Sequence, residues 1–278
     1  MDAIDLQLKI EYLGHCGIVL TPEQKSALQT SLVILKHEQK FQTVQFWGKI
    51  IGARADYFIA QGIGDDCLKD KRMLYSKDCI VWGLLPIPSP EEIEKSSYFK
   101  GRFTGDPAFE FEFTDIKQVA GEGDELIETE EIISMKEENR LAAVIARIDY
   151  DAQIIPRGAY IRVATGRVLR NKSFEGLTVA EAGKLSSYLH MRDPRRLPYV
   201  RINNPRVRTD KAIDFLDCVE DDIPKGCWAI QFEGGNNLAF VKSLLWMGFV
   251  LYHVPETNWY GSVYSGTGEY NIDLPFML

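Results

Sequence analysis

Residues 44–63 read VQFWGKIIGARADYFIAQGI, and this stretch decides the fold class of the chain. Aromatic and β-branched side chains dominate it, which is the composition of half-buried β-strands. Gly48 and Gly52 interrupt the run and are expected to divide it into strands that pair with each other. The stretch therefore predicts a sheet of paired strands in the first quarter of the chain.

Short helices are predicted outside this stretch by capping sequences. In a capping box, a Ser or Thr is followed three residues later by Glu or Gln, and each side chain bonds the other residue's backbone N–H. Three such sequences begin at Thr21, Ser89 and Thr178. The third helix is expected to continue towards His190. A further helix is expected from Thr209 or Asp210 through Val219.

Hairpins are the other recurrent prediction. Residues 73–85 and 159–169 each contain two stretches that favour an extended backbone, separated by a short turn. In residues 228–233, large apolar side chains alternate with other side chains. Strands and helices are mixed without repeating strand–helix–strand units. We therefore expect an α+β fold with antiparallel-rich sheets and several short helices. No Pro-, Gly- or Ser-rich linker divides the chain, so residues 1–278 are expected to form a single compact domain.

The middle of the chain contains a strand followed by an acidic run. In residues 108–113, AFEFEF, three Phe alternate with two Glu, so one face of the strand is apolar and the other is wet or faces a partner. Residues 121–138 contain eight acidic residues and one Lys. They are expected to begin as an exposed loop and to continue into a strand at Ile132 and Ile133 and then a helix. If the domain has two lobes, we expect them at about residues 1–120 and 130–278, with the acidic loop between them.

The composition is that of an ordinary globular protein with an acidic excess. Of the 278 residues, 45% are hydrophobic and 26% are charged, and the net charge is −8. This balance excludes a disordered chain and makes the whole chain a poor binder of nucleic acid or anionic membranes. The N-terminal residues do not resemble a signal peptide, and the longest apolar stretch, residues 243–254, is too short to span a membrane. We expect a cytoplasmic protein with reduced thiols, no nucleic-acid partner and no membrane insertion.

No motif for catalysis or cofactor binding is complete. The phosphate-loop, Gly-x-Ser-x-Gly and His-Glu-x-x-His patterns are absent. A metal site would have to gather His15, Cys16, His190 or His253 from distant segments. His253, within the apolar run FVLYHV, is expected to be a core histidine with satisfied hydrogen bonds. The sequence therefore predicts no catalytic residue, no metal ligand and no cofactor.

The sharpest local departure in charge lies between residues 192 and 211. Seven basic residues face two acidic ones there. The basic residues are Arg192, Arg195, Arg196, Arg201, Arg206, Arg208 and Lys211. Because guanidinium groups pair with carboxylates in a bidentate way, one interpretation is a loop that docks on an acidic protein surface. The alternative is that these residues form salt bridges within the chain, for example with the acidic run.

The C-terminal segment, residues 259–278, has an unusually apolar end. Trp259, Tyr260 and Tyr264 are expected in a strand, and Phe276 belongs to an apolar group close to the last residue. Leaving a large apolar side chain in water forfeits about 1.5–3 kcal/mol. We therefore expect the segment to be docked, either on the chain's own core or in a neighbouring subunit, and we favour the edge of the C-terminal sheet. Part of this aromatic surface is expected to remain for a partner protein.

Segments distributed in order over nearly the whole chain carry a family resemblance. They are FWG at 46–48, DYFIAQG at 56–62, KGRF at 100–103, GDP at 105–107, IPRGA at 155–159, FEGL at 174–177, KLSSY at 184–188, DIPKG at 222–226, SLLW at 243–246 and DLPFML at 273–278. With these segments the chain resembles the radial spoke head protein 9 family of motile cilia and flagella. Residues 14–19 and 191–208 depart from the family pattern.

The resemblance implies a non-catalytic structural subunit of the radial spoke head. Such a subunit supports spoke assembly and mechanical signalling between the central pair and the dynein-bearing doublets of the axoneme. The implied partners are the radial spoke head 4/6-type protein, radial spoke head protein 1, radial spoke protein 3 and other spoke-head subunits, with transient contact to central-pair projections. The implied location is the cytoskeleton of the cilium or flagellum. The alternatives are a cytosolic protein-binding adaptor and an unrecognised small-ligand module or enzyme.

Overall fold

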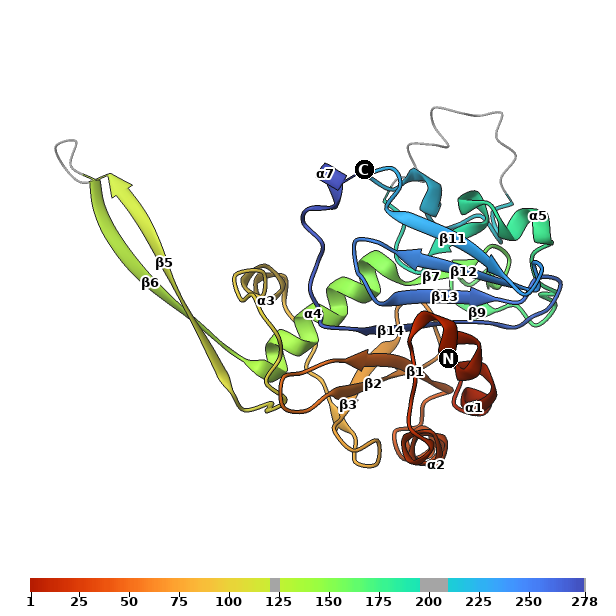
Figure 1. Cartoon of the computed structure of the whole chain (residues 1–278), viewed down its shortest axis with the longest axis horizontal. Helices are drawn as coiled ribbons and strands as arrows, with labels where there is room; N and C mark the ends of the chain where they lie inside the picture. Colours follow the sequence, from red (N-terminus) through yellow and green to blue (C-terminus); the bar gives the residue numbers. More distant parts are fainter. Residues whose placement is uncertain (121–125, 196–209, 278) are drawn as a thin grey trace.

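An eight-stranded sheet forms the centre of the computed structural model, which describes residues 1–120, 126–195 and 210–277, with the backbone alone at 115–120 and 126–131 (Figure 1). In spatial order its strands are β11 (Trp228–Glu233), β12 (Leu238–Ser243), β13 (Phe249–His253), β14 (Tyr260–Gly266), β1 (Thr43–Ile50), β2 (Tyr57–Ile63), β3 (Lys71–Ser76) and β4 (Gly83–Leu84). Neighbouring strands are antiparallel except β1 and β14, which run parallel. The sheet thus joins strands from the two halves of the chain.

Residues 44–63 form β1 and β2, as predicted, but Gly48 does not end a strand. β1 continues through Gly48 with a bulge between Phe46 and Gly48. The φ angle of Gly48 is +154°, and a Cβ atom there would lie 2.1 Å from the carbonyl oxygen of Tyr264. Glycine is needed at this position because the parallel strand β14 passes too close for a side chain.

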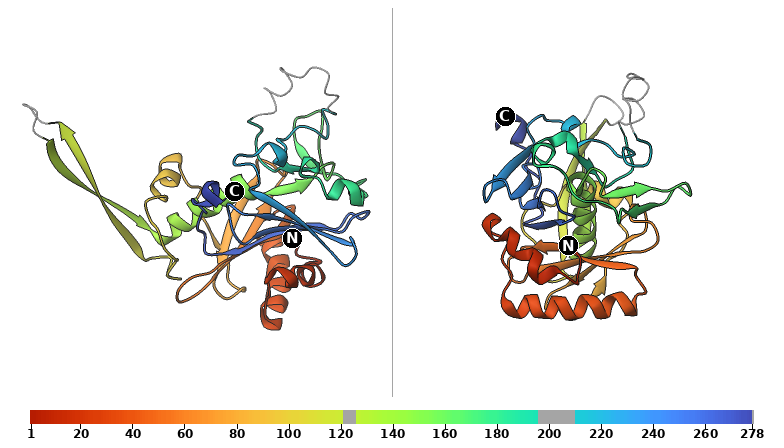
Figure 2. Two further views of the ribbon diagram at one scale, coloured as in Figure 1. Left: turned by 45° about the horizontal axis from the view of Figure 1, so that its top comes forward. Right: turned by 90° about the vertical axis from the view of Figure 1, so that its right-hand side faces the viewer.

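Helices cover both faces of the sheet (Figure 1, Figure 2). On one face, α1 (Leu6–Lys9), the 3₁₀ helix η1 (Ile10–Cys16) and α2 (Pro22–Glu38) bury apolar side chains against β1, β2, β12, β13 and β14. On the other face lies α4 (Glu137–Ala152), whose apolar stripe packs on the opposite side of the same strands. The alternation of side chains along each strand therefore supplies two cores, one on each face.

Smaller elements surround this centre. They are α3 (Pro90–Lys95), the strand pair β7 (Ile154–Pro156) and β10 (Tyr188–His190), the hairpin β8 (Tyr160–Arg162) and β9 (Val168–Arg170), α5 (Val179–Ala182), the 3₁₀ helices η2 (Leu185–Ser187) and η3 (Val219–Asp221), and α7 (Leu274–Met277). The predicted hairpins at 73–85 and 159–169 are confirmed as β3–β4 and β8–β9.

The three capping boxes are confirmed, but two predicted helix extents are wrong. The boxes at Thr21, Ser89 and Thr178 are closed by reciprocal hydrogen bonds. The helix after Thr178 ends at Ala182, because residues 188–190 pair with β7 as a strand instead. Residues 211–213 form a single turn in place of the expected helix. The chain beyond this turn is extended, because Cys218 pairs with Leu189 in an antiparallel bridge and the backbone N–H of His190 donates to the carbonyl oxygen of Asp217.

The longest strand pair lies apart from the central sheet. β5 (Glu110–Ala120) and β6 (Leu126–Lys136) form a two-stranded hairpin that projects from the body of the molecule (Figure 1, Figure 2). We call these two strands the arm. The strand predicted at 108–113 is confirmed within β5, but the acidic run is mostly strand where a loop was expected. The reason is the register, which pairs every residue from Leu126 to Lys136 with β5. The predicted α+β fold class is confirmed.

Candidate interaction surfaces

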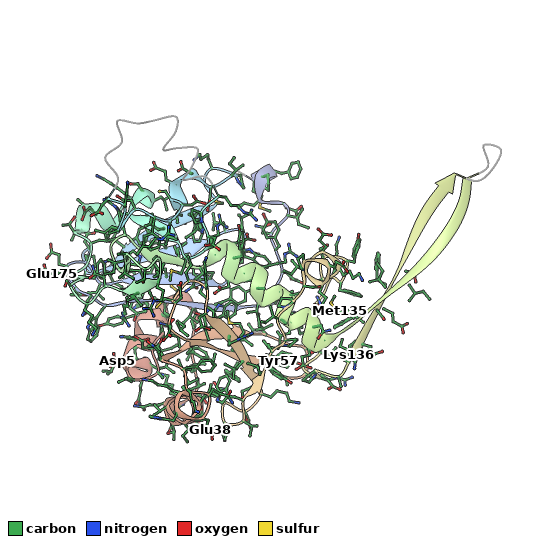
Figure 3. The ribbon with its side chains drawn as sticks, turned by 180° about the vertical axis from the view of Figure 1, so that it is seen from behind. Asp5, Glu38, Tyr57, Met135, Lys136 and Glu175 are labelled. Atoms are coloured by element: carbon green, nitrogen blue, oxygen red, sulfur yellow. The ribbon has the colours of Figure 1, made fainter. Side chains whose placement is uncertain are left out.

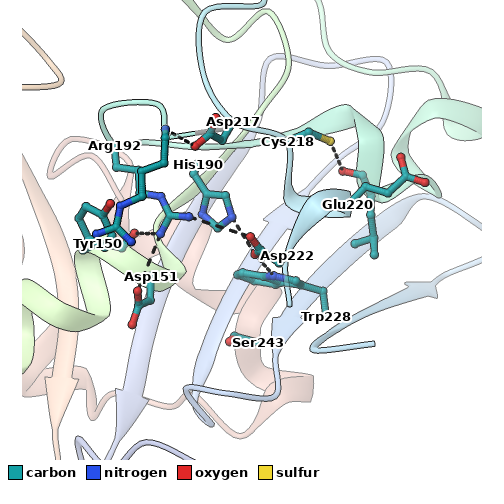
Figure 4. A network of polar contacts seen from close by, with 12 residues as sticks. Tyr150, Asp151, His190, Arg192, Asp217, Cys218, Glu220, Asp222, Trp228 and Ser243 are labelled. Atoms are coloured by element: carbon teal, nitrogen blue, oxygen red, sulfur yellow. Dashed lines mark hydrogen bonds and ion pairs between the residues drawn. The ribbon is translucent and has the colours of Figure 1, made fainter. Parts of the chain in front are cut away.

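Arg192 lies in a polar network where the C-terminal end of α4 meets β10 and β11 (Figure 4). Its Nη1 donates a hydrogen bond to the carbonyl oxygen of Tyr150 at 2.9 Å. Its guanidinium nitrogens lie 3.8 Å from the carboxylate of Asp151 and 4.0 Å from that of Asp222. The side chain is only 15% exposed. Arg192 therefore binds residues of its own chain, which favours the alternative of internal salt bridges at this position.

Asp222 joins three segments in the same network. Its Oδ2 lies 2.8 Å from Nε2 of the fully buried His190 and accepts a hydrogen bond of 2.8 Å from the indole N–H of Trp228. Burial alone would raise the pKa of Asp222, but the hydrogen bonds from His190 and Trp228 and the nearby charge of Arg192 lower it below its ordinary value. The carboxylate thus stays charged and ties β10 to β11.

Arg195 is the other basic-loop arginine within the described residues, and it is exposed. Its backbone N–H donates to the carboxylate of Asp217 at 2.6 Å, and its guanidinium carbon lies 4.5 Å from the ring centroid of Tyr150. Arg192 packs against the same ring at 4.6 Å. Tyr150 thus fixes the start of the basic loop on α4 and leaves Arg195 accessible. Arg196, Arg201, Arg206 and Arg208 lie outside the described residues.

The aromatic residues expected at an interface have different environments. Trp259 is 40% exposed, whereas Tyr260 is partly buried in β14. Tyr264 is 1% exposed, and its ring centroid lies 5.5 Å from that of Trp47 in the core. It is therefore unavailable to a partner on the surface of the folded chain, which corrects its inclusion among the contact residues. The sequence placed it in a strand correctly but could not tell which face of the sheet it would occupy.

The last residues are docked on the connection between β12 and β13. Asn271 donates from its backbone N–H to the carbonyl oxygen of Leu245 at 2.8 Å and from its side chain to that of Leu244 at 3.2 Å. Leu274 is buried in the core with an exposure of 4%. Beside these anchors, three apolar side chains remain exposed: Ile272, Phe276 and Met277. The segment is held in place and presents an apolar surface.

A second apolar surface lies at the base of the arm. An open groove of about 510 Å³ lies between residues 97–100 and residues 111–113. Its aromatic rings pack in pairs, with centroids of Tyr98 and Phe113 at 5.5 Å and of Phe99 and Phe111 at 5.9 Å. Tyr98 is nevertheless 43% exposed. The Phe stripe predicted from the sequence is thus a half-covered surface, and Tyr98 was missed because no local pattern links it to β5.

Arg140 on α4 fixes the base of the arm. Its guanidinium lies between the rings of Phe103 and Phe111, at 4.6 Å from each centroid. Its Nη2 donates to the backbone carbonyl oxygens of Phe99 and Gly101 at 3.0 and 2.6 Å. Cation–π contacts are strongest where the cation is desolvated, and Arg140 is 4% exposed. The groove therefore rests on a rigid support.

Glu137, one turn before Arg140, holds the adjoining segment against the sheet. This fully buried carboxylate accepts hydrogen bonds from the hydroxyl of Tyr57 at 2.7 Å and from the backbone N–H groups of Thr104 at 2.8 Å and Gly105 at 2.7 Å. A buried carboxylate is tolerated because these donors satisfy it. Figure 3 shows Tyr57, Met135 and Lys136 together at the junction between the arm and the body.

The five cysteines are free, and burial raises the pKa of each thiol. Burial raises the pKa of the Cys79 thiol to about 12 and those of Cys218 and Cys227 to about 11. Burial also raises the pKa values of Cys16 and Cys67. The reactive form of cysteine is the thiolate, which these surroundings disfavour at neutral pH.

In residues 1–120, 126–195 and 210–277, no cluster of three or more His, Cys, Asp or Glu side chains is arranged to hold a metal ion. In the same ranges, no helix combines the length and the apolar character that crossing a membrane requires.

Comparisons with known proteins agree with one another. The family model described as "Radial spokehead-like protein" matches residues 2–72. The chain is 46% identical to "Radial spoke head protein 9 homolog" of Homo sapiens over 278 residues, which cover 100% of both chains. It is 46% identical to the homolog of the same name in Bos taurus and 44% identical to that in Danio rerio, again over 100% of each chain.

Proposed function

Because the chain belongs to the family of radial spoke head protein 9 homologs, we propose that it is a structural subunit of the radial spoke head in the axoneme of cilia or flagella. The observation that carries this proposal is the identity of 46% along the entire length of both chains. The similarity includes the segments that build the two cores as well as the C-terminal segment. The match therefore extends over the full length of both chains.

The finer proposal is that the chain works without catalysis, through contacts with other spoke-head subunits. The raised thiol pKa values and the rigid, doubly covered sheet support such a role. We propose as partners the radial spoke head 4/6-type protein, radial spoke head protein 1 and radial spoke protein 3. Force from central-pair projections would pass through these contacts towards the dyneins.

Three exposed side chains are the proposed contact residues for these partner proteins. Trp259, Phe276 and Arg195 combine accessibility with fixed backbone supports. Large aromatic side chains and Arg are the residue types enriched at interface hot spots. A standard interface buries about 800 Å² per partner. The chain exposes 15348 Å², so several partners can bind it at once.

Replacement in ciliated cells tests the proposal. The tagged chain is expressed in cells that lack their own counterpart, and cells without any replacement provide the baseline. We expect the tag to remain with axonemes after detergent extraction and to restore spoke-head density in electron tomograms. Complete release of a normally folded chain into the detergent extract would favour the cytosolic adaptor instead.

A further inference from the structure

The arm is an isolated two-stranded sheet. Its ladder runs from the pair Glu110↔Lys136 to the pair Ala120↔Leu126, and neither strand pairs with any other strand in the part of the chain that the structure describes. Eleven residues of strand span about 36 Å. A hairpin of only two strands is marginally stable in water, and unpaired strand edges are templates for further pairing.

The arm also concentrates the charge of the chain. Its two strands contain six acidic and two basic residues. Over residues 110–136 as a whole, nine acidic and two basic residues give a net charge of −7, which leaves −1 for the rest of the chain. The register places Asp115 directly opposite Glu131. Like charges in directly opposite positions destabilise a strand pair, so a cationic partner beside this pair would relieve the repulsion.

The base of the arm adds apolar surface to this charge. Phe109 is 43% exposed, and its ring packs against that of Phe111, which lines the aromatic groove of about 510 Å³ described above. Ile132 is 69% exposed and pairs with Thr114, so it lies on the opposite face of the hairpin from Phe111 and Phe113. Glu110 and Glu112 are exposed next to the groove. The arm therefore offers a partner three things together: open strand edges, an apolar groove on a rigid base, and a strong negative charge.

We propose that the arm is the docking element for a different protein, which adds a lysine-bearing β-strand to an open edge and seats an apolar side chain in the groove. This inference rests on the proposed function, because the partner is sought within the spoke head. Strand addition uses main-chain hydrogen bonds for affinity, and charge complementarity selects the partner. A second copy of the chain is the competing occupant, because its residues 192–211 contain seven basic and two acidic residues, and the cross-linking experiment distinguishes the two.

Intact spoke heads that contain the wild-type chain supply the first test. A zero-length carbodiimide joins carboxylates to lysine amines in direct contact. We expect links from arm carboxylates to lysines of another protein, together with exchange of arm backbone amides about tenfold slower than in the free chain. Amide exchange that is equal in the free and assembled chain would refute strand addition. Links only to a second copy of the chain would refute a different protein as the occupant.

A matched pair of variants supplies the second test. Glu112→Lys with Glu128→Lys reverses two arm charges that stand opposite the neutral residues Ser134 and Gln118. The control, Glu175→Lys with Glu220→Lys, reverses two exposed charges of the body, and Glu175 lies at the end of the molecule away from the arm (Figure 3). We expect the arm variant to incorporate about tenfold less than the control and to lose most of the salt dependence of assembly.

The outcomes separate this inference from the proposed function. Equal incorporation of the arm variant and the control would overturn the arm as the docking element, while the spoke-head function would stand. Failure of the wild-type chain to enter spoke heads would overturn the function itself. Thermal melts of both variants check the fold, and the amide-exchange comparison needs no variant.

Discussion

At the scale of single residues, two hydrogen bonds determine the protonation state of the buried histidine His253. Its Nδ1 lies 3.1 Å from the carbonyl oxygen of Trp259, and its Nε2 accepts a hydrogen bond of 3.0 Å from the backbone N–H of Leu177. The neutral ring with its proton on Nδ1 satisfies both contacts. A second proton would have to be placed against the N–H of Leu177. The expectation of a satisfied core histidine is thus confirmed.

This arrangement predicts a specific pH dependence of stability. Burial lowers the pKa of His253 below its ordinary value of 6.5, although the hydrogen bond to Trp259 opposes the shift. Below about pH 6.5 the unfolded chain therefore binds a proton that the folded chain refuses, and stability falls as pH falls. We expect His253→Gln to remove this part of the pH dependence in urea unfolding between pH 7.5 and about pH 5.

The control for this prediction is a histidine on the surface. His37 is exposed near the end of α2, and His37→Gln provides the same substitution at a surface histidine for comparison. If the His253→Gln variant kept the full acid-dependent loss of stability, His253 would not be its source.

At the scale of elements, α7 places one of its side chains in the core and others at the surface. Leu274 is 4% exposed and belongs to the core on the α4 face of the sheet. Phe276, two residues later, is 88% exposed. One short segment is therefore both anchored to its own chain and available to a partner. The spacing of apolar residues in the sequence cannot separate the two roles, because all of them are large and apolar.

Two truncations in α7 test this division. Leu274→Ala should lower the free energy of unfolding by about 2–5 kcal/mol, because it removes a packed side chain from the core. Phe276→Ala should change it by less than about 0.5 kcal/mol and should instead weaken incorporation into spoke heads. Chemical unfolding and axonemal incorporation are measured for both variants. A large loss of stability in Phe276→Ala, with assembly unaffected, would reverse the assignment of roles.

At the scale of the whole molecule, the parallel pair of β1 and β14 binds the two halves of the chain together. Gly48, Lys49 and Ile50 pair with residues 264–266 across more than two hundred positions of sequence. The same sheet continues on one side through β2, β3 and β4 and on the other through β13, β12 and β11. Each half alone would expose the edge of the sheet at which β1 and β14 pair, together with apolar side chains on both faces of the sheet beside that edge.

We therefore expect the proposed lobes not to fold alone. Residues 1–120 and 130–278, expressed separately, should show no cooperative thermal unfolding and poor dispersion of amide signals in NMR spectra. The control is co-expression of the two fragments, which should restore a cooperative transition. A cooperative melt of either isolated fragment would establish two independent lobes in place of the single domain.

Local signals in the sequence determined much of the secondary structure. The capping boxes at Thr21, Ser89 and Thr178 mark helix starts because their hydrogen bonds close within four residues. The strands in 44–63, 108–113 and 228–233 follow from residue types that favour an extended backbone. Family membership was also visible in the sequence, through ordered segments that extend to the last residue.

The tertiary structure alone decided which of these residues are exposed at the surface. Arg192 and Arg195 look alike in the sequence. In the structure, however, Arg192 pairs with the carboxylates of Asp151 and Asp222, whereas Arg195 is exposed. Tyr264 and Phe276 are both aromatic residues near the end of the chain, yet only the first is buried in the core, where its ring packs against that of Trp47. The partners that settle these differences lie far away in sequence. Burial and charge pairing are properties of neighbours in space, whereas caps and strand propensities are properties of neighbours along the chain.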